Sequence, residues 1–162
     1  MGGFCGLGYA PVQTTYQIPK VTFQPGEEVD IALNCDNSAT RLSVKSFKVK
    51  LFRRIETSVD HPGVKNNFPV KNIYQFDSKN GRFQGCPARQ QYQTTIRFRI
   101  PETETDRKTP LCGSINTKFL KVAYELRCYV KHNGIFQKGQ GNCITFPIVL
   151  VERPHDLTSQ KL

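Results

Sequence analysis

Six cysteines and three histidines are the residues of this chain that could attack a substrate, hold a metal ion or change redox state. The cysteines show no C-x-x-C spacing, so the pattern of a zinc ribbon or a dithiol redox site is missing. The histidines, His61, His132 and His155, fall in stretches typical of turns or of a polar tail. No G-x-S-x-G, H-E-x-x-H or phosphate-loop motif accompanies them. We therefore expect no catalytic residue, no metal ion and no cofactor.

Two of the cysteines, Cys86 and Cys112, fall in stretches expected to be loops and are candidates for a reactive or oxidisable thiol. The alternative is an exposed thiol without a role. Cys35 and Cys128 share strand parity with aliphatic residues, which predicts small core side chains instead. Disulfides are arithmetically possible, but neither a signal-peptide pattern nor an N-x-Ser/Thr sequon is present. Free thiols in a reducing compartment are the favoured interpretation.

Basic residues are the most informative chemical feature of the chain. Lysine and arginine total 23 against 13 acidic residues, a formal net charge of +10. Such a charge favours anionic partners, such as nucleic acid, anionic lipid or phosphorylated peptide, without choosing among them. Strand parity places seven cations on the polar faces of three predicted strands: Lys48, Lys50, Arg97, Arg99, Lys121, Arg127 and Lys131.

If those three strands are neighbours, the seven cations form one positive concave sheet face. Arginine and lysine on such a face can bind phosphate or acidic groups, and arginine can do so bidentately. Ordinary solvated sheet faces, with lysines that protect sheet edges, are the alternative explanation.

The elements that must position these side chains are β-strands. Apolar and polar residues alternate with a period of two, which is the pattern of half-buried antiparallel strands. The clearest alternating stretches are 29–35, 47–51, 92–100 and 120–131. Further strands are expected over 12–18, within 64–76, and over 144–151, where a more continuously apolar run suits burial on both faces.

Turn residues such as Pro25-Gly26 and Asn80-Gly81 separate these stretches, and residues 101–119 are predicted to be a long loop. The sequence shows no convincing amphipathic helix and no apolar run long enough to span a membrane. The 162 residues suit one domain. Seven to eight strands with turn punctuation predict an all-β, antiparallel, immunoglobulin-like β-sandwich.

Four segments, in order, give the chain a resemblance to the C-terminal domain of the arrestin family, nearest to the α-arrestins. An aromatic-x-Pro-Gly-Glu turn is matched by Phe23-Gln24-Pro25-Gly26-Glu27, and an E-N-x-S-S-R turn by Asn34-Cys35-Asp36-Asn37-Ser38 with Thr40-Arg41. An I-x-V-x-Y-x-L strand is matched by 120–126, and an L-P-L-V-I last strand by 146–150. The match spans about Phe4 to Val151.

The sequence also departs from the family pattern. The stretch from Glu56 to Gln91 is longer and more polar than usual, and an N-terminal arrestin domain and a tail with Pro-Pro-x-Tyr motifs are missing. We expect Met1 to begin a fragment cut near the domain crossover. On this view 1–10 is a flexible crossover or fragment start, 11–153 the arrestin-C-like sandwich, and 154–162 a loose C-terminal tail.

The resemblance implies a non-catalytic adaptor that docks cytoplasmic tails of membrane-protein cargo and trafficking machinery. It implies a cytoplasmic location, with peripheral association at the plasma membrane or endosomes. Anionic phospholipid and inositol phosphate are further expected partners, whereas nucleic acid is not expected, because no nucleic-acid-binding signature is present. The alternative is a β domain that binds polyanions generically.

Overall fold

The computed structural model describes residues 12–58, 65–67, 69–77, 85–104, 109–132 and 143–152. Over these residues the chain forms ten strands and no helix. The strands are β1 (Gln13–Gln17), β2 (Thr22–Phe23), β3 (Glu28–Asp36), β4 (Val44–Ser58), β5 (Lys65–Asn67), β6 (Lys71–Asp77), β7 (Gln91–Arg99), β8 (Ile115–Asn116), β9 (Leu120–His132) and β10 (Cys143–Leu150). Residues 1–10 and 154–162, His61, His155 and the Asn80-Gly81 turn signal lie outside the described residues.

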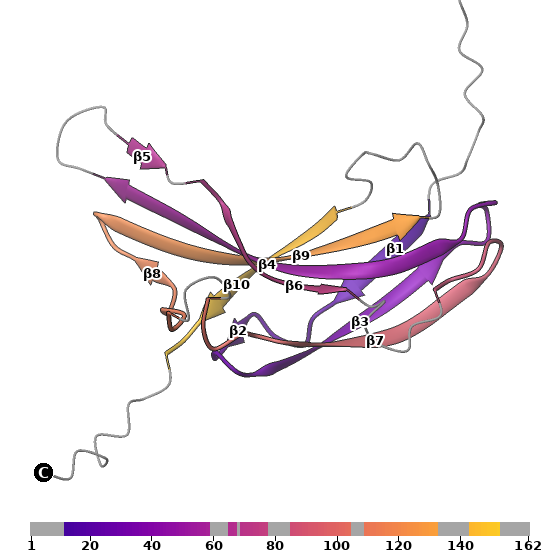
Figure 1. Ribbon diagram of the computed structural model, residues 1–162, viewed down its shortest axis with the longest axis horizontal. Coiled ribbons are helices and arrows are strands. Elements are labelled where there is room, and N and C mark those ends of the chain that lie inside the picture. The colour runs from indigo at the N-terminus through magenta and orange to yellow at the C-terminus, as the bar shows by residue number, and fades with distance from the viewer. Residues whose placement is uncertain are drawn as a thin grey trace, which may run out of the picture.

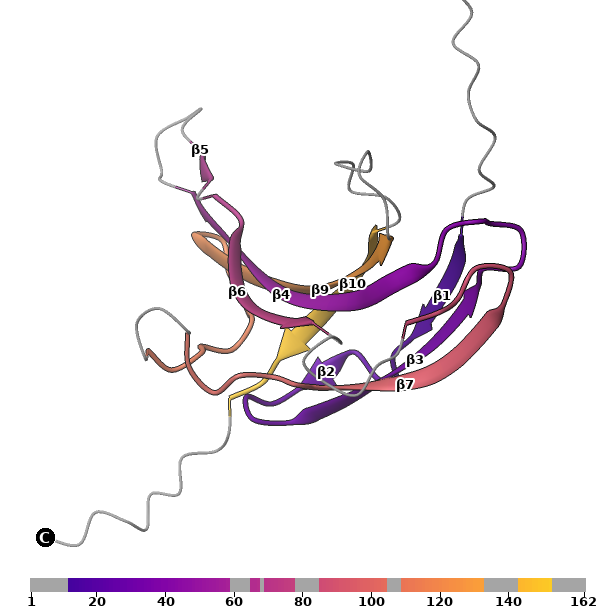
Figure 2. The same cartoon turned by 45° about the vertical axis from the view of Figure 1, so that its right-hand side comes forward.

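The strands form two sheets, as predicted for a β-sandwich. The small sheet has the order β1-β3-β7, and the large sheet has the order β2-β10-β9-β4-β5, with β6 on β4 and β8 on β9. Every described pair is antiparallel except β2 with β10. Figures 1 and 2 show the large sheet strongly curved, with the small sheet on its convex side. The face turned away from the small sheet is here called the concave face.

The predicted period of two sets the core. Along β3, Val29, Ile31 and Leu33 are buried, and the residues between them are exposed. β4 and β9 bury their alternate apolar residues against this layer, and rings from the two sheets meet where Tyr74 lies 5.6 Å from Phe98. Cys35 and Cys128 are fully buried among these residues, which confirms them as core side chains.

β10 corrects one expectation about burial. Ile148 and Leu150 face the core, but Thr145, Pro147 and Val149 are exposed, so the strand is not buried on both faces. The reason is that the outer side chains of β10 lie on the concave face, away from the small sheet. Its apolar outer residues therefore need another explanation than the core.

Two turns carry the motifs that led to the family resemblance. Pro25-Gly26 forms the tight turn between β2 and β3, where Glu27 N donates to Gln24 O at 3.1 Å and Gly26 takes a φ of 86°. Asn37 is fully buried after β3, and its side-chain Nδ2 donates to Leu42 O at 2.9 Å and to Pro87 O at 2.8 Å. This amide therefore joins the β3–β4 turn to the segment that precedes β7.

Candidate functional site

The concave face brings together five of the seven predicted cations. Lys48 and Lys50 come from β4, and they lie opposite Tyr129 and Arg127 of β9 in the register of the two strands. Lys131 lies opposite Ser46 at one end of this pairing, and Lys121 lies opposite Glu56 at the other. Because Lys121 is six residues from Arg127 along β9, the two are about 20 Å apart. We therefore call only Lys48, Lys50, Arg127 and Lys131 the cationic patch.

Aromatic rings support the centre of the cationic patch. Lys50 Nζ lies 5.4 Å from the centre of the Tyr129 ring, and the Arg127 guanidinium lies 4.1 Å from that of Phe52. These contacts hold the charged ends over rings on the sheet surface. Arg127 also forms an ion pair with Glu125, which partly neutralises it. A tyrosine is protonated at neutral pH even at its ordinary pKa of about 10, and burial raises the pKa of Tyr129 further, so its hydroxyl can donate a hydrogen bond.

Arg97 and Arg99 do not join the other five cations, so the condition for one basic face, that the three strands are neighbours, is not met. Both lie on β7, which pairs with β3 in the small sheet. Arg97 Nε lies 3.0 Å from Asp30 Oδ1, and Arg99 bonds Glu102 at 3.3 Å. Parity gives the face of a strand but not its neighbours. Here the neighbouring β3 supplies an acidic partner for Arg97, and the segment after β7 supplies one for Arg99.

Cys86 is also corrected by the structure. It is fully buried, because a bridge to Val44 holds its backbone against the start of β4. Its Sγ contacts the carbonyls of Pro87 and Gln90 at 3.6 and 3.7 Å, and burial raises the pKa of the thiol. A buried thiol with a raised pKa is a poor nucleophile.

The other described thiols form no reactive pair. Cys112 is half-buried, with Sγ 3.4 Å from the Tyr124 hydroxyl, and that hydroxyl donates to Cys112 O at 2.9 Å. Cys143 is the one exposed cysteine among the described residues, and sequence reasoning did not single it out. Its position in the alternating pattern of β10, on the same side as the polar Thr145, could have predicted that it is exposed. All five described cysteines are free. No group of three or more metal-ligating side chains occurs in the described ranges.

A buried carboxylate, Glu104, is a further feature that sequence reasoning missed. It lies in the loop segment 101–104 after β7, is 5 % exposed, and forms ion pairs with Arg53 of β4 and Lys71 of β6. The hydrogen bond from Lys71 and the charge of Arg53 lower the pKa of Glu104 despite its burial. The cluster ties the loop to the large sheet, and its three members come from segments that no local motif connects.

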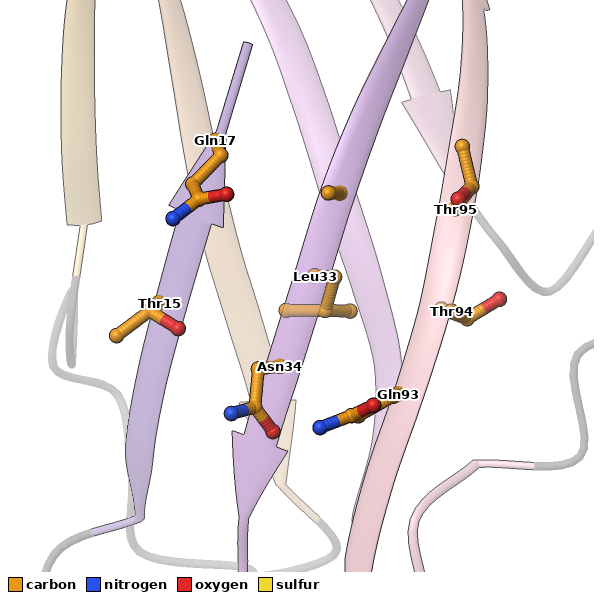
Figure 3. A pocket seen from close by; sticks show the side chains of 8 residues that line it. Thr15, Gln17, Leu33, Asn34, Gln93, Thr94 and Thr95 are labelled. Atoms are coloured by element: carbon orange, nitrogen blue, oxygen red, sulfur yellow. The ribbon is translucent and has the colours of Figure 1, made fainter.

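A shallow open hollow of about 490 Å³ lies on the outer face of the small sheet. Figure 3 shows Thr15 and Gln17 of β1, Asn34 of β3 and Gln93 and Thr95 of β7 around it. The short side chain of Ala32 leaves the space between them. Its lining is neutral and holds no thiol, carboxylate or imidazole, so it offers hydrogen bonds but no nucleophile and no charge.

The family comparison agrees with the two-sheet, all-β fold. Residues 9–155 match the family model described as arrestin (or S-antigen), C-terminal domain. A search of curated proteins finds no match. Among solved structures, Spo0M, a sporulation control protein from Bacillus subtilis, is similar at 16% identity, covering 89% of this chain with a TM-score of 0.49. The chain spans about half of that protein's length, as 50% of it is covered. In the part of the chain that is described, no helix has the length and apolar character to cross a bilayer.

Proposed function

Because this chain belongs to the arrestin C-terminal domain family, we propose that it is an adaptor domain whose cationic patch docks acidic or phosphorylated tails of membrane proteins. The family is one of non-catalytic interaction domains. On this proposal the domain works in the cytoplasm, at the plasma membrane or endosomes, where such tails and the trafficking machinery are found. Inositol phosphates and anionic headgroups are further ligands of the same chemistry.

The observation that carries the proposal is the set of cross-strand neighbours on the concave face. Lys50 and Arg127 face each other across β4 and β9, each over an aromatic ring, with Lys48 and Lys131 in the flanking positions. Neighbouring cations on one sheet face repel one another, which is unfavourable for the free protein. An anionic ligand removes that repulsion, and the guanidinium can take a carboxylate or phosphate bidentately.

A generic polyanion surface is the second candidate, since the net charge of +10 attracts any anion. The two candidates differ in where the charge matters. A docking site depends on particular cations of the concave face, whereas generic attraction depends on total charge and falls steeply with salt.

The test is fluorescence anisotropy at near-physiological salt with the full chain. A multiply phosphorylated peptide is titrated beside its unphosphorylated twin and a single-stranded oligonucleotide of similar charge. The double variant Lys50→Ala/Lys131→Ala is compared with Arg97→Ala/Arg99→Ala, and each lowers the net charge from +10 to +8. We expect phosphopeptide affinity to fall about tenfold in the first variant only, from about 1.4 kcal/mol of lost charge contacts. Equal losses in both variants, or tighter oligonucleotide binding, would refute a specific docking face.

A further inference from the structure

The concave face carries apolar side chains directly beside the cationic patch; Pro147 and Val149 are exposed, and Phe52 and Ala123 are half-buried. We call Phe52, Ala123, Pro147 and Val149 the apolar stripe. Phe52 and Pro147 lie on either side of Glu125 in the register of β4, β9 and β10. Val149 follows Ile148, which pairs with Tyr124, so it lies beside Ala123. The stripe therefore runs across three strands rather than along one.

The core does not account for the stripe. The residues that alternate with it, Tyr124, Leu126 and Ile148, are the ones that are buried. Val149 is 44% exposed, and Pro147 is exposed as well. Glu125 lies between Phe52 and Pro147, and Arg54 lies opposite Ala123, so charged residues border the stripe. A sheet face turned to water normally carries polar residues, and an apolar group there is typical of an interaction site.

Position along β9 relates the stripe to the cationic patch. The stripe is level with residues 123 and 125, and the cationic patch is level with 127, 129 and 131. The midpoints of the two groups are five residues apart, which is about 17 Å in a strand. An extended peptide has the same rise per residue, so the spacing on the sheet becomes a spacing in the ligand.

The shape of the face favours a peptide over a membrane. The large sheet is strongly curved (Figure 2), and by strand register both groups lie on its face turned away from the small sheet. A single extended chain can follow this curvature, but a bilayer surface cannot. The charge of the patch requires acidic or phosphorylated residues in that chain. The stripe requires large aliphatic or aromatic residues, which can pack on Pro147, Val149 and the edge of the Phe52 ring.

We propose that the ligand of the concave face is a bipartite extended peptide, with large apolar residues about five positions from a cluster of acidic or phosphorylated residues. This rests on the proposed function and specifies its ligand. The apolar residues lie on the stripe and the anionic residues on the cationic patch. Charge draws the peptide to the domain, and the fixed distance between the two groups sets which tails bind.

Three synthetic peptides with the same cluster of glutamates test the proposal against the full chain. The first places a Leu-Leu pair five residues from the cluster, the second places it next to the cluster, and the third has Ser-Ser at the five-residue position. We expect the first to bind about tenfold more tightly than the other two. Val149→Ser/Ala123→Ser should remove this advantage. Phe119→Ser should keep it, although Phe119, 50% exposed on the β8–β9 turn, offers more apolar surface.

The outcomes separate this proposal from the docking function. Equal binding of all three peptides, still weakened by Lys50→Ala/Lys131→Ala, would overturn the bipartite ligand and leave the anionic docking face intact. Equal binding of the two leucine peptides would overturn the spacing. Loss of the leucine advantage in Phe119→Ser would show that apolar contact is nonspecific. No binding of any peptide would overturn both proposals.

Discussion

The substitution Glu104→Gln tests the buried charge cluster. The side chain is only 6% exposed and faces Arg53, 15% exposed, and Lys71, 34% exposed. The amide keeps the size and shape of the carboxylate but removes its charge. Two cations are then left facing each other without their shared partner, and Arg53 Nε is already buried without a hydrogen-bond partner.

The expected loss of stability follows from the exposures of the two partners. Removing one member of a buried ion pair costs about 3–5 kcal/mol, because the remaining charge is uncompensated. Lys71 can turn its ammonium to water, so its unpaired charge adds little to the loss of stability. Most of the loss comes from Arg53, which is less exposed. We expect the free energy of unfolding to fall by about 3 kcal/mol, at the lower end of that range. For a chain of this size, that corresponds to a drop in Tm of about 6–12 °C.

Urea unfolding measures this difference, and Glu102→Gln is the matched control two residues away. Glu102 is 57% exposed and pairs with Arg99, which is 64% exposed. An exposed pair contributes about 0–1 kcal/mol, so the control should lie within that range. If Glu104→Gln costs no more than Glu102→Gln, then the cluster does not stabilise the fold and the reasoning fails.

Acid titration gives a second measure of the same group. The pKa of Glu104 is lower in the folded chain than in the unfolded one, so its contribution is complete above the ordinary carboxyl pKa of about 4.3. That contribution is lost as pH falls through the lowered pKa. The stability curves of the wild type and of Glu104→Gln should therefore differ at neutral pH and converge in acid. Parallel curves would contradict the assignment.

Three further predictions concern Gly85, Asn37 and the thiols. Gly85→Ala should lower the free energy of unfolding in urea by about 2 kcal/mol or more, because Gly85 has a φ of 80° and an added Cβ would lie 2.5 Å from Val44 O. An unchanged midpoint of urea unfolding would contradict this close approach. Asn37→Ala should lower the free energy of unfolding by about 2 kcal/mol in the same assay, because Pro87 O loses its side-chain donor and Leu42 O keeps only the Thr40 hydroxyl at 3.2 Å. A loss below about 1 kcal/mol would contradict the role of this amide. In the native protein, an aromatic disulfide reagent should modify Cys143, seen as one fast equivalent lost in Cys143→Ser. The buried thiols Cys35 and Cys128, whose pKa values burial raises to about 12, should react only after unfolding.

Much of the fold could be predicted because alternation has a direct physical cause. Residues such as Val29 and Ile31 must face the core if Asp30 faces water, and the sandwich follows from several such strands. The seven strands of five or more residues match the predicted number, while β2, β5 and β8, with two or three residues each, are too short to show a period.

The candidate site could be predicted only in part. Parity put Lys50 and Arg127 on polar faces, and pairing of β4 with β9 made them neighbours. Pairing depends on contacts between residues far apart in the sequence, so nothing local separated Arg97 from that group. The same limit explains Cys86 and Glu104, which are buried by β4 and β6 rather than by their own loops.

The place of β10 between β2 and β9 has a consequence for how the chain folds. Thr22 pairs with Val149, so this contact joins residues 127 positions apart (149 − 22). β2 is made early in synthesis, but β10, its partner, is the last of the described strands to be made. Until β10 is in place, β2 and one edge of β9 have no neighbouring strand. Contacts between such distant residues slow folding, because a long loop must close before they form. Completion of the large sheet is therefore expected to be a late and slow step, during which the nascent domain exposes strand edges that chaperones can bind.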